Sequence, residues 1–89
     1  MRIIRERIWT WFLPDNERPV DPVEWRQHGG KWLIFDRQEE LLALAHKLEP
    51  YIDSGDIHGA KSWNGDPSGL NVYALDNDKE NVKNIVVFV

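Results

Sequence analysis

Two lysines, a tyrosine and a tryptophan are the residues whose types and positions could do chemistry. Lys31 opens one apolar segment, Lys61 lies in a second and Tyr73 lies in a third. If these segments are neighbouring strands, two ammonium groups and a phenol converge on one face of a sheet. Such a cluster attracts an anion such as a phosphoryl or carboxylate group. Strand lysines also occur simply as protection of a sheet edge, so that alternative stays open.

The fourth candidate, Trp25, lies in a long segment that is rich in proline and charge. Residues 14–30, PDNERPVDPVEWRQHGG, predict a loop, with one helical turn at 22–25 that Asp21 caps and Pro22 begins. Loops of this length are uncommon inside compact domains and are often functional. Arg5 and Arg7, on the first predicted strand, could add positive charge to the lysines.

Other reaction centres have little support. No metal-binding spacing is matched by His28, His46, His58 or the DSGDIH segment. Within that segment, Gly55 followed by Asp56 is typical of a turn. The serines lie in no nucleophile elbow, and GGK at 29–31 precedes a strand, so no helix N-terminus follows it to bind phosphate. We therefore predict no metal site, no cofactor and no catalytic residue.

Composition restricts the class of protein. The 89 residues predict one small domain over 1–89, and the absence of cysteine favours a reducing, cytoplasmic environment. No apolar run approaches the ~20 residues of a membrane-spanning helix, and no secretory signal is evident. The net charge of -4 makes non-specific binding to duplex nucleic acid unlikely. We expect a monomer whose partner is a small anionic ligand or a protein.

The first half of the chain predicts two strands and a helix. Residues 3–13 predict a strand, most securely over 7–13, and residues 31–36 predict a second. Apolar residues at helical spacing predict a helix over 37–48, with Asp36 and Glu39 as a capping box and Pro50 as its end or kink.

The second half predicts a hairpin and a helix. Residues 59–63 and 70–75 predict antiparallel strands around the turn sequence NGDPSG at 64–69. Apolar residues at helical spacing favour a helix from about residue 78, although the final VVFV also has strand propensity. No polar cap follows VVFV, so a natural chain that continues is one interpretation.

Together these elements predict an α+β fold: a curved, largely antiparallel sheet of about four strands with two helices packed on one face. Alternation along the strands places Lys61 with Trp63, Lys31 with Leu33, and Trp9 with Trp11. If the face of Trp9 and Trp11 meets the helices they are core, which we favour. If it is the open face, they form the floor of a binding pocket.

The segments that carry a resemblance to a known family are GGKWLIFDRQEELLALAHKL, then AKSW, NVYAL and a capped helix. Through them the chain resembles an uncharacterised domain family of archaea and eukaryotes whose fold is like that of the messenger-RNA cap-binding initiation factor. The resemblance covers roughly residues 9–86 and implies a curved antiparallel sheet backed by helices. Cap binding stacks a base between two tryptophans on loops at opposite sides of a slot. Trp25 is best placed for that role and Trp63 is second, although fold alone does not carry function.

The same layout more distantly resembles bacterial phosphothreonine lyases, in which a lysine abstracts a proton, a histidine protonates the leaving group, and a second lysine and a tyrosine hold the phosphate. The resemblance implies these roles for Lys31, Lys61 and Tyr73. Leu33 occupies the acid position and leucine cannot transfer a proton, so we expect an anion pocket without lyase activity.

We therefore predict a small binding domain for an anionic or aromatic ligand, such as a nucleotide or a phosphorylated peptide, at Lys31, Lys61, Tyr73 and Trp25. The alternatives are a lyase-like enzyme that lacks the acid histidine, and a protein–protein adaptor, since tryptophan is enriched at interfaces.

Overall fold

One five-stranded antiparallel sheet organises the computed structural model, which describes residues 1–16 and 21–89. The strands are β1 (Arg2–Arg5), β2 (Trp9–Leu13), β3 (Gly29–Asp36), β4 (Gly59–Trp63) and β5 (Ser68–Leu75). The helices are α1 (Pro22–His28), α2 (Gln38–Lys47), α3 (Glu49–Ser54) and α4 (Lys79–Phe88), with a short 3₁₀ helix at Asp76–Asp78. The order in the sheet is β1-β2-β4-β5-β3, so β1 and β3 are open edges and no barrel closes. The α+β prediction is confirmed, with one strand and two helices more than expected.

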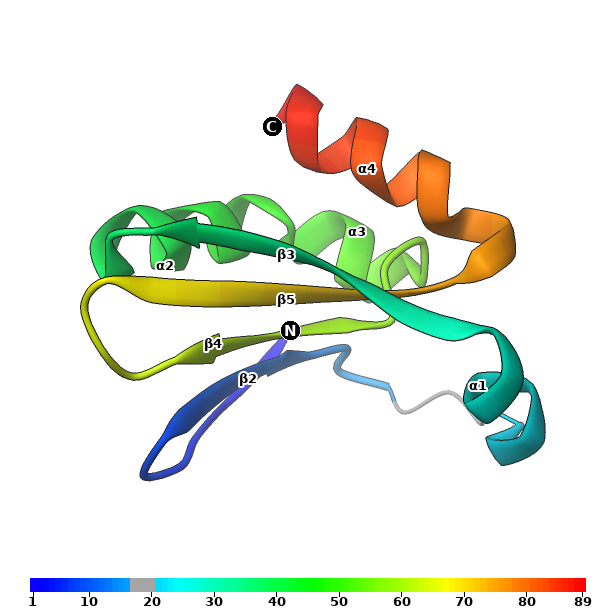
Figure 1. Cartoon of the computed structure of the whole chain (residues 1–89), viewed down its shortest axis with the longest axis horizontal. Coiled ribbons are helices and arrows are strands. Elements are labelled where there is room, and N and C mark those ends of the chain that lie inside the picture. The colour runs from blue at the N-terminus through cyan, green and yellow to red at the C-terminus, as the bar shows by residue number, and fades with distance from the viewer. Residues whose placement is uncertain (17–20) are drawn as a thin grey trace.

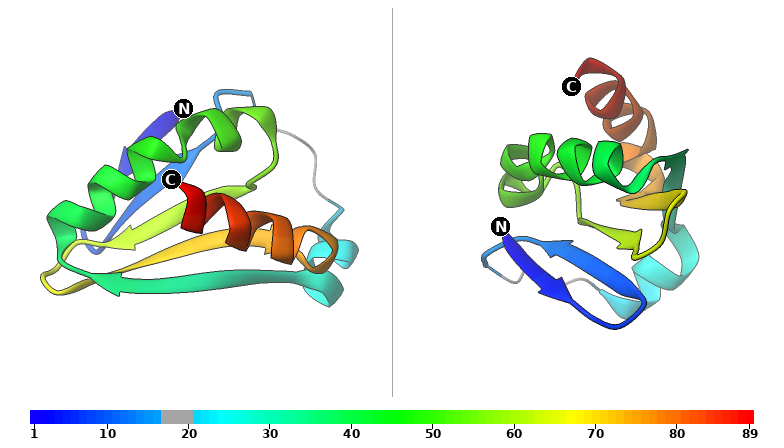
Figure 2. Two further views of the ribbon diagram at one scale, coloured as in Figure 1. Left: turned by 90° about the horizontal axis from the view of Figure 1, so that it is seen from above. Right: turned by 90° about the vertical axis from the view of Figure 1, so that its left-hand side faces the viewer.

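Helices α2, α3 and α4 lie on one side of this sheet (Figure 1). The view from the end of the molecule shows that the sheet is twisted below these helices (Figure 2). The core between these layers is apolar, and its burial is the main stabilising term, at roughly 25 cal/mol per Å². The buried apolar residues are Phe12, Leu41, Ala45, Leu48, Ile52, Ile57, Ala60, Leu70, Val72, Ala74 and Val82. No helix in the described part of the chain is long and apolar enough to cross a membrane.

The predicted first strand is two strands. β1 and β2 form a hairpin in which Arg2 lies opposite Leu13 and Arg5 opposite Thr10. The turn between them carries no glycine or proline, which is why its sequence did not predict it. It is closed by a hydrogen bond of 2.8 Å from the Glu6 amide to the Trp9 carbonyl. The side chain of Asn64 also donates to the Glu6 carbonyl, so the neighbouring hairpin holds this turn.

The predicted capping box is wrong. Helix α2 begins at Gln38 rather than Arg37, and Asp36 accepts only from the adjacent Arg37 amide, at 2.7 Å. The Gln38 amide instead donates to the Asp66 carboxylate at 3.0 Å. Asp66 belongs to the loop between β4 and β5, so a distant segment caps this helix.

The predicted break of the second helix near Pro50 is confirmed. The helical run breaks at Leu48, α3 begins just before Pro50, and Gly55 ends α3 with a positive φ of 91°, the left-handed conformation that glycine favours. A C-terminal helix is confirmed as α4. The loop of the β4–β5 hairpin covers residues 64–67, shorter than predicted, because β5 already begins at Ser68.

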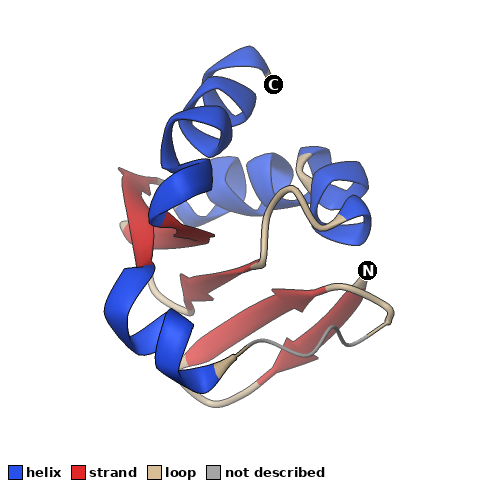
Figure 3. Ribbon diagram, turned by 90° about the vertical axis from the view of Figure 1, so that its right-hand side faces the viewer, coloured by secondary structure: helices blue, strands red, loops and turns tan. Residues whose placement is uncertain are grey.

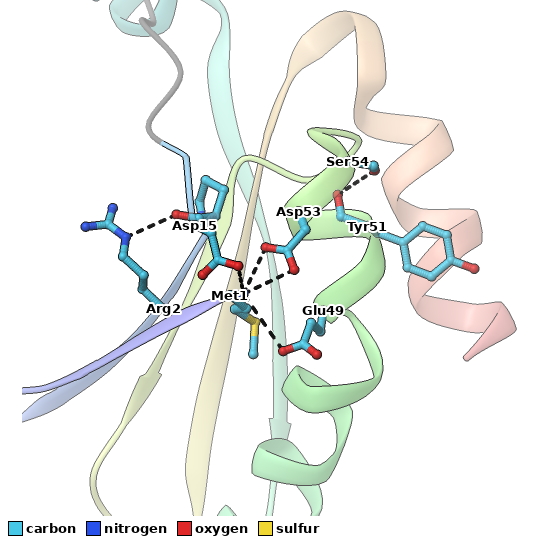
Figure 4. A network of polar contacts seen from close by, with 8 residues as sticks. Met1, Arg2, Asp15, Glu49, Tyr51, Asp53 and Ser54 are labelled. Atoms are coloured by element: carbon cyan, nitrogen blue, oxygen red, sulfur yellow. Dashed lines mark hydrogen bonds and ion pairs between the residues drawn. The ribbon is translucent and has the colours of Figure 1, made fainter.

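The N-terminal ammonium group of Met1 joins segments that are far apart in sequence (Figure 4). It lies 2.8 Å from the Asp15 carboxylate, which follows β2, and 3.1 Å from the Asp53 carboxylate on α3. Glu49 lies farther away, at 4.0 Å. These ion pairs connect edge strand β1 to the helical layer.

Candidate functional site

The face of the sheet opposite α2, α3 and α4 carries most of the candidate residues. Directly opposed residues of antiparallel strands share a face. Phe12 pairs with Ala60 and faces the helices, so the alternate pair Trp11 and Lys61 faces the other way. Lys31 likewise lies directly opposite Tyr73. The open face (the name used below) consists of Arg2, Ile4, Trp9, Trp11, Leu13, Gly29, Lys31, Leu33, Phe35, Gly59, Lys61, Trp63, Gly69, Asn71, Tyr73 and Leu75.

The expectation that Trp9 and Trp11 are core is therefore wrong. Thr10 and Phe12 alternate with them and are the buried residues of β2, at 5% and 1% exposure. The helix-facing side of neighbouring β4 offers only the small residues Ala60 and Ser62. Such small side chains suit a closely packed helical layer, whereas two indoles need the space of the open face.

An aromatic pocket of about 430 Å³ lies at one end of the open face, lined by Trp11, Trp25, Tyr73 and His58, with Leu13 and Pro22 at its margin. The Trp11 and Tyr73 rings are nearly parallel, with an interplanar angle of 15° and centroids 6.5 Å apart. The Trp25 ring lies 6.3 Å from Tyr73 and 5.3 Å from His58. Four rings therefore converge on one hollow, which suits a flat ligand.

Helix α1 lies at one end of the sheet, away from the other helices (Figure 3). Its residue Trp25 lines the aromatic pocket. The helix is longer than the single turn predicted, but it starts as expected, because Asp21 accepts from the Val23 amide at 2.9 Å and a proline occupies the first turn. The indole then folds back onto Gly29, where an added Cβ would lie 2.6 Å from the ring. Gly29 is needed here for close approach, since its φ of -73° is ordinary.

A hydrogen bond from the Trp11 indole nitrogen to the Glu6 carboxylate fixes the second large ring of the pocket. Asn64 holds the same turn through a hydrogen bond of 2.7 Å from its amide to the Ile8 carbonyl. The β1–β2 turn thus orients Trp11 from outside the pocket.

The two candidate lysines make the open face positive. The Lys61 ammonium lies 4.1 Å from the centre of the Trp9 ring and 4.9 Å from that of Trp11. Lys31 borders a smaller hollow with Trp25 and Tyr73. Neither lysine takes part in any ion pair recorded for the described residues, and no acidic residue occupies an open-face position of the strands. In a chain of net charge -4, this segregation leaves cationic groups available to an anion.

A second pocket, of about 530 Å³, occupies the other end of the open face. Trp9, Trp63 and Phe35 supply its rings, and Lys31 and Asn71 supply its polar groups. Phe35 is 74% exposed and Trp63 is 45% exposed, which is unusual for large apolar side chains without a partner.

The structure brings all four predicted site residues, Lys31, Lys61, Tyr73 and Trp25, to one face, but it does not add Arg5. Arg5 lies opposite Thr10 and lines a hollow on the helical side with Gln38. Arg7 lies in the turn outside the strands. Leu33, the acid position of the lyase resemblance, lies on the open face and is 46% exposed.

His58, Phe35 and Asn71 line the pockets but were not predicted as site residues. Alternation along the strands puts Asn71 on the face of Tyr73 and Phe35 on the face of Lys31. His58 precedes its strand, so only its proximity to Trp25 reveals it. Within the described ranges, no group of three or more His, Asp or Glu could hold a metal ion.

Comparisons of the chain with protein-family models, with curated proteins and with solved structures found no match. The geometry of the open face is therefore the basis for assigning a function.

Proposed function

We propose that this chain is a binding module whose open face holds a ligand that combines a flat aromatic ring with an anionic group, a nucleotide being the simplest example. The observation that supports this proposal is a pocket lined by the rings of Trp11, Trp25 and Tyr73 beside two lysines without acidic partners. Rings alone suit many apolar ligands, and lysines alone suit many anions. Their combination on one face favours a ligand that has both features.

The chemistry assigns the two parts of a nucleotide to different residues. The base enters between Trp25 and Trp11, where stacking on an aromatic side chain contributes about 1–3 kcal/mol. The phosphate lies toward Lys61 and Lys31, whose ammonium groups bind it as point charges. Because a mononucleotide uses one pocket and both lysines, we expect weak binding, with a dissociation constant on the order of millimolar.

The experiment is a titration with nucleoside monophosphates, followed by amide and indole signals in NMR spectra. We expect localised shifts for the indoles of Trp11 and Trp25, and none for Trp32, whose indole nitrogen donates to the Lys79 carbonyl on the helical side. Inorganic phosphate and the free nucleosides separate the two contributions. A complete lack of localised shifts at millimolar ligand would refute the proposal.

Binding of phosphothreonine peptides at a lyase-like site is the second candidate, and the direct pairing of Lys31 with Tyr73 favours it. Leu33 provides no acid for the leaving group, so we expect such a peptide to bind without losing phosphoric acid. Mass spectrometry of the peptide distinguishes binding from turnover.

A further inference from the structure

The open face holds two ring-lined pockets rather than one, and a mononucleotide fills only the first. Tyr73 lines the first pocket and Gly69 lines the second. These two residues are four positions apart on β5, which is about 13 Å along a strand. Lys61 and its neighbour Asn71 lie between the two ends, and Lys31 borders both.

This spacing matches a polymer of flat, anionic units in an open conformation. Stacked bases in a duplex are about 3.4 Å apart along one strand, far less than the separation of the pockets. The pockets therefore suit bases that are unstacked and splayed apart, as they are when single strands bind aromatic side chains on a protein surface. The lysines lie where the connecting phosphates would pass.

We infer that the open face binds single-stranded nucleic acid, with one base in each pocket and the intervening phosphates against Lys61 and Lys31. This inference rests on the proposed function and extends it from a nucleotide to an oligonucleotide. Charge complementarity supports this occupant, because Lys31 and Lys61 lie on the face whose strand positions carry no acidic residue, and the nearby Glu6 carboxylate is bound to the Trp11 indole. A duplex does not fit, since its bases are already stacked and cannot reach the rings.

The test compares single-stranded oligothymidylate and oligouridylate of about one to six nucleotides, a range that exceeds the span of the two pockets. The two series distinguish DNA from RNA as the source of the same chemistry. Fluorescence anisotropy of labelled strands, or NMR for the shortest, gives the affinity. We expect affinity to rise with length until both pockets are filled.

Variants separate the two pockets. Trp63→Ala and Phe35→Ala alter only the second pocket, and loss of one stacking ring is expected to weaken oligonucleotide binding about 5- to 150-fold while leaving mononucleotide binding unchanged. Trp25→Ala should weaken both. Phe88→Ala, which removes an exposed ring from α4, is the matched control.

Salt dependence gives an independent measure of the lysines. Each phosphate neutralised on a single strand contributes a slope of about -0.7 in log affinity against log salt, so two lysines predict about -1.4. Lys61→Ala should reduce this slope by about half, whereas Lys47→Ala on α2 should leave it unchanged.

Equal affinity for mononucleotides and oligonucleotides, with no effect of Trp63→Ala or Phe35→Ala, would overturn this inference while leaving the proposed function intact. Duplex binding as tight as single-strand binding would also overturn it. Absence of binding by both mononucleotides and oligonucleotides would refute the two proposals together.

Discussion

Lys61 combines, in one side chain of the open face, a positive charge and contacts with two aromatic rings. Its ammonium lies over the rings of both Trp9 and Trp11, where the negative ring faces hold it without a carboxylate. Cation–π contacts at exposed sites contribute about 0.5–1 kcal/mol, so this position is stable but can be altered by a ligand. An approaching anion therefore meets a cation that is already oriented on the face.

Iodide quenching of tryptophan fluorescence tests this placement. Replacement of Lys61 by glutamine removes a positive charge about 4 Å from the rings, which in water changes the interaction with an anion by about 1 kcal/mol, or roughly fivefold in local concentration. We expect quenching by iodide to fall by up to that factor in Lys61→Gln, while quenching by neutral acrylamide stays the same.

Lys47→Gln is the control, because it removes the same charge from the helical layer. An equal fall with acrylamide would mean that the rings had become buried. No change with iodide would mean that Lys61 does not contribute to the field at the indoles.

At this scale the sequence predicted which residues share a face but not which face is open. The period of two along β2 paired Trp9 with Trp11 and Thr10 with Phe12, and both pairs contain aromatic rings. The choice depends on the neighbouring strand, where Ala60 and Ser62 occupy the buried positions. Which residues of β4 lie opposite those of β2 is known only once the strands are paired in three dimensions.

Among the elements, α1 matters most for the site, although it contributes least to the core. It contains no buried residue, and its fixed geometry depends on the hydrogen bond from the Gly29 amide to the Trp25 carbonyl and on the close approach of the indole to that glycine. The role of this helix is therefore to position Trp25.

Substitution of Gly29 by alanine should displace helix α1. The added Cβ meets the Trp25 carbonyl oxygen and then the Trp25 ring, so the helix must shift and the indole should lose its contacts with His58 and Tyr73. We expect nucleotide binding to weaken by about the 1–3 kcal/mol of one stacking ring. The free energy of unfolding should change by only about 1 kcal/mol, because no core residue is disturbed.

Gly30→Ala is the matched control, since no heavy atom lies within 4 Å of a Cβ at that neighbouring position. The comparison needs ligand titration and denaturant unfolding of both variants. If Gly30→Ala weakened binding as much as Gly29→Ala, the contact between Trp25 and Gly29 would not be the cause.

Sequence periodicity predicted most elements and missed those set by distant segments. The turn at Glu6 lacks turn residues and depends on hydrogen bonds from Asn64. Asp36 and Glu39 have the local signature of a cap, yet Asp66 takes the amide of Gln38 instead. In both cases a side chain from the β4–β5 loop determines the local structure, and no local pattern records that contact.

Across the whole molecule, the sheet, the segment after β2 and the helical layer meet at the Met1 ammonium. The Asp15 carboxylate, which accepts a hydrogen bond from this group, raises its pKa above the ordinary value of 8.0; burial opposes the effect and the Asp53 carboxylate adds to it. The sequence could not predict this network, because residues 1, 15 and 53 belong to three different segments.

This network predicts that stability falls at alkaline pH. Since the pKa of the Met1 ammonium is higher in the folded chain than in the unfolded chain, its contribution is fully present below about pH 8 and is lost as pH rises through the folded value. Urea unfolding at about pH 7 and about pH 9.5 should show a smaller free energy of unfolding at the higher pH. Acetylation of the N-terminal amine removes the titrating group, and Asp15→Asn removes its first partner, so both should flatten this dependence. A slope that persists unchanged after acetylation would show that other groups cause it, and that the ion pairs of Met1 do not join the sheet to the helices energetically.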